Sequence, residues 1–362
     1  MTGLKLLCSC FFMLHVTKAC TEFFMKTEDE SVVIGRTMDF DDELRSNVLF
    51  IPKETARKSA LPSFCGQAPP LKWTYKYDVL CLNAFNQSIC PDGMNSKGLS
   101  VGSLMLPQYT VYANVTRDDC SNMVSNMQLP SFLLGSYKSV KDIRNDINTN
   151  KFPKVFDASL LSNHYKLHFT ITDTSGDALV LEFTKDGRKA HDNIVGVTTN
   201  APPYDFHMMN IKNYVHLSKF SAGSFNVGDV IFTPVGSGGG IHGIPGDFSP
   251  TSRFIRTTYL LHFSNKPKTT EEGVVLASHL LHSVDVPRGV VQDGTPPKEG
   301  TFDYTQWVVI KDLKNLILYL RYYDDLSFRK FDMKEFQRRE SRTAHGRRGV
   351  IPDDTRNEAV VF

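Results

Sequence analysis

The junction between residues 19 and 20 constrains this chain more than any other feature of its sequence. Lys5 supplies a positive charge, residues 6–16 are mostly apolar, and the small residue Ala19 stands immediately before Cys20. This order is typical of a secretory signal peptide and its cleavage site, and the apolar stretch is too short to span a bilayer. A buried N-terminal strand or helix is the competing interpretation. We expect residues 1–19 to be removed, so that the folded chain begins with a cysteine.

The other cysteines agree with an exported protein. Two of the seven cysteines, Cys8 and Cys10, would leave with the signal peptide. Exported chains favour disulfides, and four of the remaining cysteines can form two of them in a pairing that the sequence does not determine. These four are Cys65, Cys81, Cys90 and Cys120. Cys20 is then the odd thiol, which is either reactive or joined to another chain.

Two N-glycosylation sequons lie in the same part of the chain. They begin at Asn86 and Asn114. A sequon marks an exposed loop in a protein of the secretory route. Together with the signal peptide, the sequons predict a glycoprotein that is secreted or delivered to a lysosome.

Hydrophobic patterns predict a mixed α+β fold. Alternating apolar and polar residues indicate three hairpins, which pair residues 21–25 with 31–37, 166–172 with 178–184, and 305–311 with 316–322. Helical patterns cover residues 139–147, 206–217, 251–263 and 269–283. We expect residues 20–333 to form one domain. The polar, arginine-rich residues 334–362 are expected to form a disordered tail.

Length and charge exclude several classes of protein. The chain of 362 residues can bury a large core, and its net charge of +2 gives no reason to expect a nucleic-acid partner. No later apolar run is long enough for an integral membrane segment. The Gly-rich loop at residues 236–248 lacks the Lys-Ser/Thr of a phosphate-binding loop. No histidine spacing indicates a metal site.

A cysteine at the first position can supply both a nucleophile and a base. Its α-amino group has a pKa of about 7.7–8.0, so near neutral pH the amine can accept the proton of the thiol. Arg36 and Asp39 end the strand that is predicted to pair with the strand of Cys20. A carboxylate there could hold the ammonium group, and a guanidinium group favours the thiolate. Taken alone, these two residues are better explained by a local salt bridge at a strand end.

Five blocks in order give these residues a more specific meaning. They are Ala19-Cys20-Thr21 with Gly35-Arg36-Thr37-Met38-Asp39-Phe40, then Asn95-Ser96-Lys97-Gly98-Leu99-Ser100, Thr199-Asn200-Ala201-Pro202, Gly243-Ile244-Pro245-Gly246-Asp247 and Ser252-Arg253-Phe254. This series resembles the choloylglycine hydrolase / penicillin V acylase family. The resemblance extends from residue 20 to about residue 325, over nearly all of the mature chain.

The resemblance implies an N-terminal nucleophile hydrolase fold, a four-layer αββα sandwich with no metal or organic cofactor. It implies hydrolysis of the carbon–nitrogen bond of a small-molecule N-acyl amide. Cys20 would be nucleophile and base, Arg36 would contact the thiol, and Asp39 would hold the amino group. Asn200 would donate to the oxyanion of the intermediate, and Arg253 would complete the polar network.

One block departs from the family pattern. Ser103-Leu104-Met105-Leu106-Pro107 stands where the family usually has Gly-Leu-Asn-Phe-Pro, or Tyr in place of that Asn. Met105 therefore replaces the residue that donates to the oxyanion in bile-salt-type members. The resemblance also places Met105 and residues near Phe24 at the wall of the acyl pocket. We expect a preference for fatty or aromatic acyl groups over conjugated bile salts.

Two alternatives compete with this interpretation. The first is an acid-ceramidase-like or N-acylethanolamine amidase, which usually exposes its cysteine by internal cleavage after a long prosegment. The second is a catalytically silent secreted binding protein of the same fold. A homo-oligomer is compatible with all three.

Overall fold

Two antiparallel sheets form the centre of the protein, which a computed structural model describes for residues 19–160, 163–292, 302–342 and 359–360. The predicted signal peptide, up to residue 18, lies outside these ranges. The first sheet has the strand order β16 (Val197–Thr198), β1 (Cys20–Lys26), β2 (Val32–Phe40), β19 (Tyr304–Asp312), β20 (Ile317–Tyr322), β21 (Asp325–Asp332) and β22 (Ala359–Val360). The second has the order β15 (Gly187–Asp192), β14 (Ala178–Thr184), β13 (Leu167–Thr172), β8 (Ser100–Met105), β7 (Gln87–Asn95), β6 (Val79–Ala84) and β3 (Val48–Ile51).

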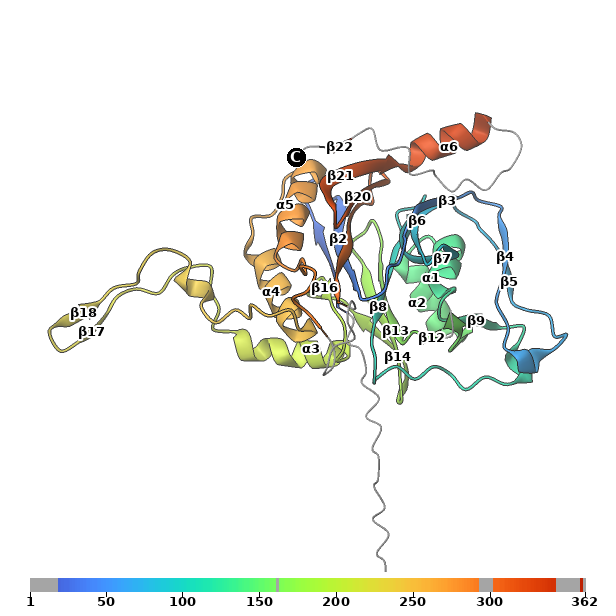
Figure 1. The fold of residues 1–362 in the computed structure, drawn as a ribbon, viewed down its shortest axis with the longest axis horizontal. Helices are drawn as coiled ribbons and strands as arrows, with labels where there is room; N and C mark the ends of the chain where they lie inside the picture. Colours follow the sequence, from blue (N-terminus) through green and yellow to red (C-terminus); the bar gives the residue numbers. More distant parts are fainter. Residues whose placement is uncertain (1–18, 161–162, 293–301, 343–358, 361–362) are drawn as a thin grey trace, which may run out of the picture.

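Helices cover the outer face of each sheet and complete four layers (Figure 1). On the first sheet, α4 (Pro250–Phe263) packs against β1 and β16, and α5 (Thr270–His282) packs against β2 and β19. On the second sheet, α1 (Leu129–Ser136) packs against β7 and β8, and α2 (Val140–Asn148) follows it. The predicted αββα sandwich is therefore confirmed.

Both faces of the first sheet are buried at β1, β2 and β19, and alternation along these strands decides which side chains meet. Phe23 and Val33 point to α4 and α5, whereas Cys20 and Ile34 belong to the core between the two sheets. Every residue of β2 is buried. Cys20 therefore begins its strand facing the centre of the molecule.

The three predicted hairpins are confirmed. They are β1 with β2, β13 with β14, and β19 with β20. Three of the predicted helices correspond to α2, α4 and α5, and Thr269 caps α5 by accepting from Glu272 N at 3.3 Å. The helix predicted at 206–217 is shorter than expected: α3 (Tyr204–Asn210) continues as a 3-10 turn, Ile211–Tyr214.

The prediction of a disordered tail is wrong for residues 334–342. These residues belong to α6 (Met333–Arg342). Its Phe336 stacks on Phe50 of β3 with ring centroids 5.7 Å apart, which anchors the helix to the second sheet. The rest of the predicted tail lies outside the described residues, except for β22.

Four short two-stranded units complete the described structure. They are β4 (Ala56–Lys58) with β5 (Lys72–Thr74), β9 (Met123–Ser125) with β10 (Lys154–Phe156), β11 (Ser159–Leu160) with β12 (Asn163–His164), and β17 (Phe225–Val227) with β18 (Val230–Phe232). The last pair forms the end of a hairpin that projects away from the sandwich (Figure 1). Among the described residues, no helix is both long and apolar enough to cross a bilayer.

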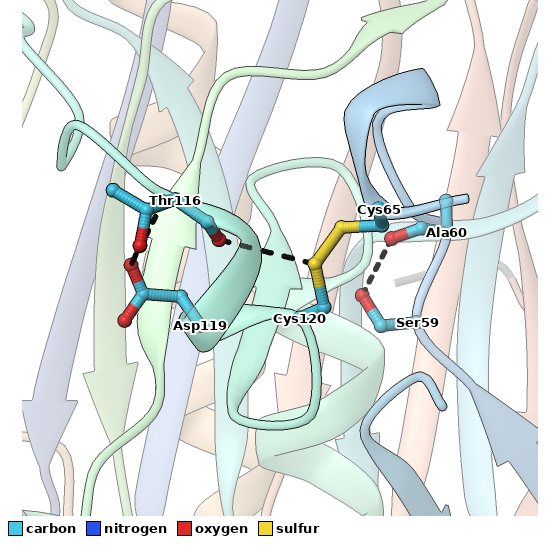
Figure 2. Close-up of a disulfide and its surroundings, with 6 residues drawn as sticks. All are labelled: Ser59, Ala60, Cys65, Thr116, Asp119 and Cys120. Atoms are coloured by element: carbon cyan, nitrogen blue, oxygen red, sulfur yellow. Dashed lines mark hydrogen bonds between the residues drawn. A yellow bond between two sulfur atoms is a disulfide. The ribbon is translucent and has the colours of Figure 1, made fainter. Parts of the chain in front are cut away.

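Of the five cysteines that the structure describes, four pair as two disulfides and Cys20 is free, as the sequence predicted. One disulfide joins Cys81 of β6 to Cys90 of β7. The other joins Cys65, in the 3-10 turn Ser63–Cys65, to Cys120, which follows the 3-10 turn Arg117–Asp119 (Figure 2). Both sequon residues, Asn86 and Asn114, are exposed.

Candidate active site

The thiol of Cys20 lies between the sheets and is almost completely buried, with 1% of the residue exposed. Its Sγ is 3.7 Å from Met38 Sδ, across the strand pair, and 3.8 Å from the backbone oxygen of Asp39. Burial raises the pKa of the Cys20 thiol, and the nearby Arg36 guanidinium opposes this effect. The positive charges around Cys20 therefore decide how much thiolate forms.

Asn200 and Arg253 hold the backbone of Cys20. The nitrogen of Cys20 donates to Asn200 Oδ1, and the Arg253 guanidinium donates to the carbonyl oxygen of Cys20. Arg253 also donates to Asn200 Oδ1 at 2.9 Å, so the three residues form one connected network. This arrangement agrees with the place expected for Arg253 in the polar network.

The side-chain nitrogen of Asn200, which was expected to face an oxyanion, donates to the backbone oxygen of Met105 at 3.0 Å. A primary amide carries two N–H groups, and this bond uses one of them. The same bond fixes the end of β8 beside Cys20. Asn200 thus lies next to Cys20, and its donation to an oxyanion stays a prediction.

Asp39 is buried close to Cys20 but does not bind its backbone nitrogen in the described chain. Its carboxylate accepts hydrogen bonds from Thr37 at 3.2 Å and from Thr305. Burial raises the pKa of Asp39 to about 7, and the nearby Arg253 charge limits that rise. Because Ala19 is attached here, the nitrogen of Cys20 is an amide rather than an amine.

Asp303 is a further acidic residue at this position, and no sequence pattern indicated it. Its Oδ2 accepts from the backbone nitrogen of Ala19 at 2.9 Å. Burial, together with the neighbouring Asp39, raises the pKa of Asp303 to about 8. Two buried carboxyl groups therefore lie on the side of Cys20 where its amine would be exposed.

The Arg36 guanidinium, which was expected to contact the thiol, forms its hydrogen bonds with the second sheet, and the contact with the thiol stays a prediction. The guanidinium donates to Asp92 Oδ2 at 2.9 Å, to Pro91 O at 3.0 Å and to Ser103 O. Asp92 also forms an ion pair with Lys311, at 2.9 Å. Arg36 therefore acts on the thiol through its charge, and these buried partners hold that charge in place.

Two histidines contact the backbone carbonyl oxygens of Thr199 and Asn200. His168 Nε2 lies 2.9 Å from the carbonyl oxygen of Thr199, and His207 Nε2 lies 3.0 Å from that of Asn200. Burial lowers the pKa of His207 to about 4, so His207 is neutral near pH 7. A carbonyl oxygen only accepts, so His207 donates from Nε2. Nothing in the spacing of His207 distinguished it from an ordinary core histidine.

A narrow apolar cavity of about 50 Å³ opens beside the thiol. Its lining includes Cys20, Met38, Phe40, Phe85, Met105 and Tyr165. Met105 therefore borders the same cavity as Cys20, and its place in an acyl pocket stays a prediction. Phe24 lies elsewhere and lines a separate cavity of about 310 Å³ with Val195 and Leu261. Four residues of strand separate Phe24 from Cys20, a distance of roughly 13 Å.

The fold and the site together define a hydrolase with the N-terminal nucleophile hydrolase fold. Comparison with known proteins agrees with this class. The sequence model of the linear amide C-N hydrolases, choloylglycine hydrolase family, matches residues 20–339. The chain belongs to this family, and it is a hydrolase of carbon–nitrogen bonds in linear amides. The match does not favour the acid-ceramidase-like alternative.

Several relatives have described activities or structures. The chain is 30% identical to bile salt hydrolase/transferase of Clostridium perfringens over 321 residues, which cover 87% of this chain and 93% of that protein. It is 23% identical to penicillin V acylase of Pectobacterium atrosepticum, covering 83% and 77%. A mutant conjugated bile acid hydrolase from C. perfringens has a similar structure, with a TM-score of 0.76 at 28% identity, covering 87% and 93%. Penicillin V acylase from Agrobacterium tumefaciens has the same fold, with a TM-score of 0.70 at 20% identity, covering 87% of each chain.

Proposed function

We propose that the mature protein begins at Cys20 and hydrolyses linear N-acyl amides whose acyl group is apolar and narrow. One observation carries the proposal. Asn200 binds the backbone nitrogen of Cys20 and Arg253 binds its backbone oxygen, while the thiol borders an apolar cavity. The family match, which begins at residue 20, supports the same starting residue.

The proposed reaction uses the α-amino group of Cys20 twice. The amine takes the proton of the thiol, and the thiolate attacks the amide carbonyl carbon. The ammonium then protonates the leaving amine, and a thioester remains. Water, activated by the same amine, hydrolyses the thioester and releases the acid. The second N–H of Asn200 is the proposed donor to the oxyanion.

The cavity beside the thiol supports an aromatic or unbranched acyl group. Its wall is formed by Met38, Phe40, Met105 and other apolar side chains. Methionine side chains adapt to differently shaped ligands. Met105 stands in this wall at the position where the resemblance places an asparagine in bile-salt-type members. We therefore rank conjugated bile salts, the substrates in the names of several relatives, below fatty or aromatic acyl amides.

A kinetic comparison of substrates tests this ranking. We expect kcat/KM to be higher for penicillin V and for N-acyl amino acids with phenylacetyl or straight-chain acyl groups than for glycocholate. Selectivity along the straight-chain series should be modest, because one methylene group is worth only about 1–3 kcal/mol. A much higher kcat/KM for glycocholate would overturn the ranking. No hydrolysis of any amide would favour the silent binding protein instead.

The proposed mechanism requires a free amine on Cys20. We expect intact-mass analysis and N-terminal sequencing of the protein from a secreting eukaryotic host to give Cys20 as the first residue. After enzymatic deglycosylation, residues Asn86 and Asn114 should carry the mass change of a removed glycan. Fully active protein that starts upstream of Cys20 would contradict the mechanism. Glycosylation and secretory or lysosomal location are part of this proposal.

We further propose that the protein forms a homo-oligomer through its projecting hairpin, residues 219–239. Every residue of this hairpin from Lys219 to Gly239 is exposed, and Phe225 stacks on Phe232 with centroids 5.2 Å apart. Neighbouring Ile231 is 66% exposed. Apolar side chains gathered on a projection usually mark an association site. A second copy of the chain is the partner that we propose.

Replacing Phe225 and Phe232 together by serine should therefore lower the molecular mass in solution. Sedimentation velocity at several protein concentrations measures this change. Leu326→Ser is a suitable control, because Leu326 is 75% exposed at a different place. A wild-type protein that is monomeric at all concentrations would exclude the proposed association.

A further inference from the structure

Four buried ionisable side chains form one cluster between the two sheets. Glu22, Arg36 and Lys311 come from β1, β2 and β19 of the first sheet, and Asp92 comes from β7 of the second. Glu22 is 4% exposed, and the other three are completely buried. Two positive and two negative groups balance the charge of the cluster. Such a set is costly to bury and stabilises a fold only when its members are paired.

One carboxylate oxygen joins the two cations of this cluster. Asp92 Oδ2 lies 2.9 Å from Arg36 Nη1 and 2.9 Å from Lys311 Nζ. Lys311 also lies 3.7 Å from Glu22 Oε2. Glu22 accepts from Thr170 of β13 through its other oxygen. The position of the Arg36 guanidinium thus depends on a carboxylate that Lys311 shares.

The Arg36 guanidinium also fixes part of the wall beside the nucleophile. It donates to the backbone oxygens of Pro91 and Ser103, and both residues line the cavity next to Cys20. In the β1–β2 register, Cys20 is opposite Met38 and Glu22 is opposite Arg36, so Arg36 is the diagonal neighbour of Cys20 on the same face. A change in the cluster should therefore alter both the position of the Arg36 charge and the part of the cavity wall formed by Pro91 and Ser103.

We propose that Lys311 and Glu22 are positioning residues of the active site, which act through Asp92 and Arg36 to set the positive charge beside Cys20. The inference rests on the proposed role of Cys20 as the nucleophile. Lys311 touches neither the thiol nor its cavity, so its effect is carried by the carboxylate that it shares with Arg36. Because Lys311 and Glu22 carry opposite charges, removing one or the other should shift the ionisation of the Cys20 thiol in opposite directions.

The test measures the ionisation of the thiol directly in the mature protein. Ultraviolet absorbance of the thiolate is followed against pH, with the Cys20→Ala protein as the blank. Lys311→Met removes a positive charge and should raise the thiol pKa. Glu22→Gln removes a negative charge and should lower it, each by a shift on the order of one pH unit. Asp39 and Arg253 also act on Cys20, and Asp303 lies beside Asp39, but all three are the same in all variants.

The double variant Lys311→Met/Glu22→Gln restores a neutral cluster, so its thiol pKa should return toward that of the wild type. Lys311→Arg should stay close to the wild type. Lys314→Met is the matched control, because Lys314 pairs with Asp29 on the surface. The acidic limb of the pH profile of kcat/KM should move with the thiol pKa.

A purely structural cluster would give a different result. Both single variants would then lower stability to urea while the thiol pKa stayed unchanged or moved in the same direction, and this would overturn the proposal. If Lys311→Met does not fold, Glu22→Gln still decides the question, because glutamine keeps the oxygen that accepts from Thr170. The titration needs no substrate. A protein that hydrolyses no amide but shows opposite thiol shifts would overturn the proposed function and leave the charge coupling intact.

Discussion

The Cys20→Ala protein is expected to fold and to hydrolyse no amide at a measurable rate. The Cys20 thiol makes only weak contacts, with Met38 Sδ and the backbone oxygen of Asp39, so its removal disturbs little packing. The backbone nitrogen of residue 20 can still donate to Asn200. Removal of a nucleophile lowers turnover by a factor on the order of 10⁶ in enzymes that act through a covalent intermediate. Turnover and unfolding in urea should be measured on the same preparation.

Cys20→Ser serves as the companion variant. It keeps the α-amino group and the shape of the side chain but offers a hydroxyl group, which the amine activates poorly near neutral pH. We expect a small fraction of wild-type activity and correct removal of residues 1–19 in both variants, verified by mass. Wild-type turnover by Cys20→Ala would show that the nucleophile lies elsewhere.

Local sequence patterns predicted the parts of the fold that depend on local interactions. The three hairpins join strands that are close in sequence, so alternation and turn residues were sufficient to locate them. Helix α1 was not predicted. Its residues Leu129–Gly135 are all buried, so it has no polar face and no helical period of apolar residues. Helix α6 was taken for a tail because most of its residues are charged or polar.

The residues of the candidate site that belong to family blocks were predicted from the sequence. The charged residues that pair across distant strands were not. Cys20, Asn200 and Arg253 came from separate blocks, and the fold brings them into one network. Lys311 and Asp92 are 219 residues apart, and no local pattern in either strand shows that they pair. Lysine and aspartate in a strand indicate a solvated position more often than a buried one.

Phe24 shows the limit of carrying a position over by resemblance. The family resemblance placed residues near Phe24 at the wall of the acyl pocket. A strand advances about 3.3 Å with each residue, so four residues bring Phe24 to the far end of β1 and into another cavity. Met105 lies on a different strand, yet it reaches the site because β8 ends beside Cys20.

Gly102→Ala is expected to destabilise the protein strongly, although it adds a single methyl group. Gly102 lies on β8, and a Cβ atom there would collide with Glu22 Oε2 and would approach Thr170 Oγ1 to 2.7 Å and Arg36 Nη1 to 2.9 Å. The backbone of Gly102 does not have the positive φ that favours glycine, so the requirement arises only from this close approach. The methyl group would have to displace the side chains of Glu22 and Arg36, which pair with Lys311 and Asp92.

Disrupting a buried ion pair costs about 3–5 kcal/mol, and we expect the free energy of unfolding in urea to fall by this amount. The activity should fall as well, because Arg36 would lose its fixed position beside Cys20. Gly223→Ala is the control: a Cβ atom at Gly223 meets no atom within 4 Å, so the expected change is below about 0.5 kcal/mol. Equal m-values in urea would show that both variants unfold from equally compact states. An unchanged midpoint for Gly102→Ala would mean that the cluster tolerates an added methyl group, and that the position of Arg36 does not depend on this contact.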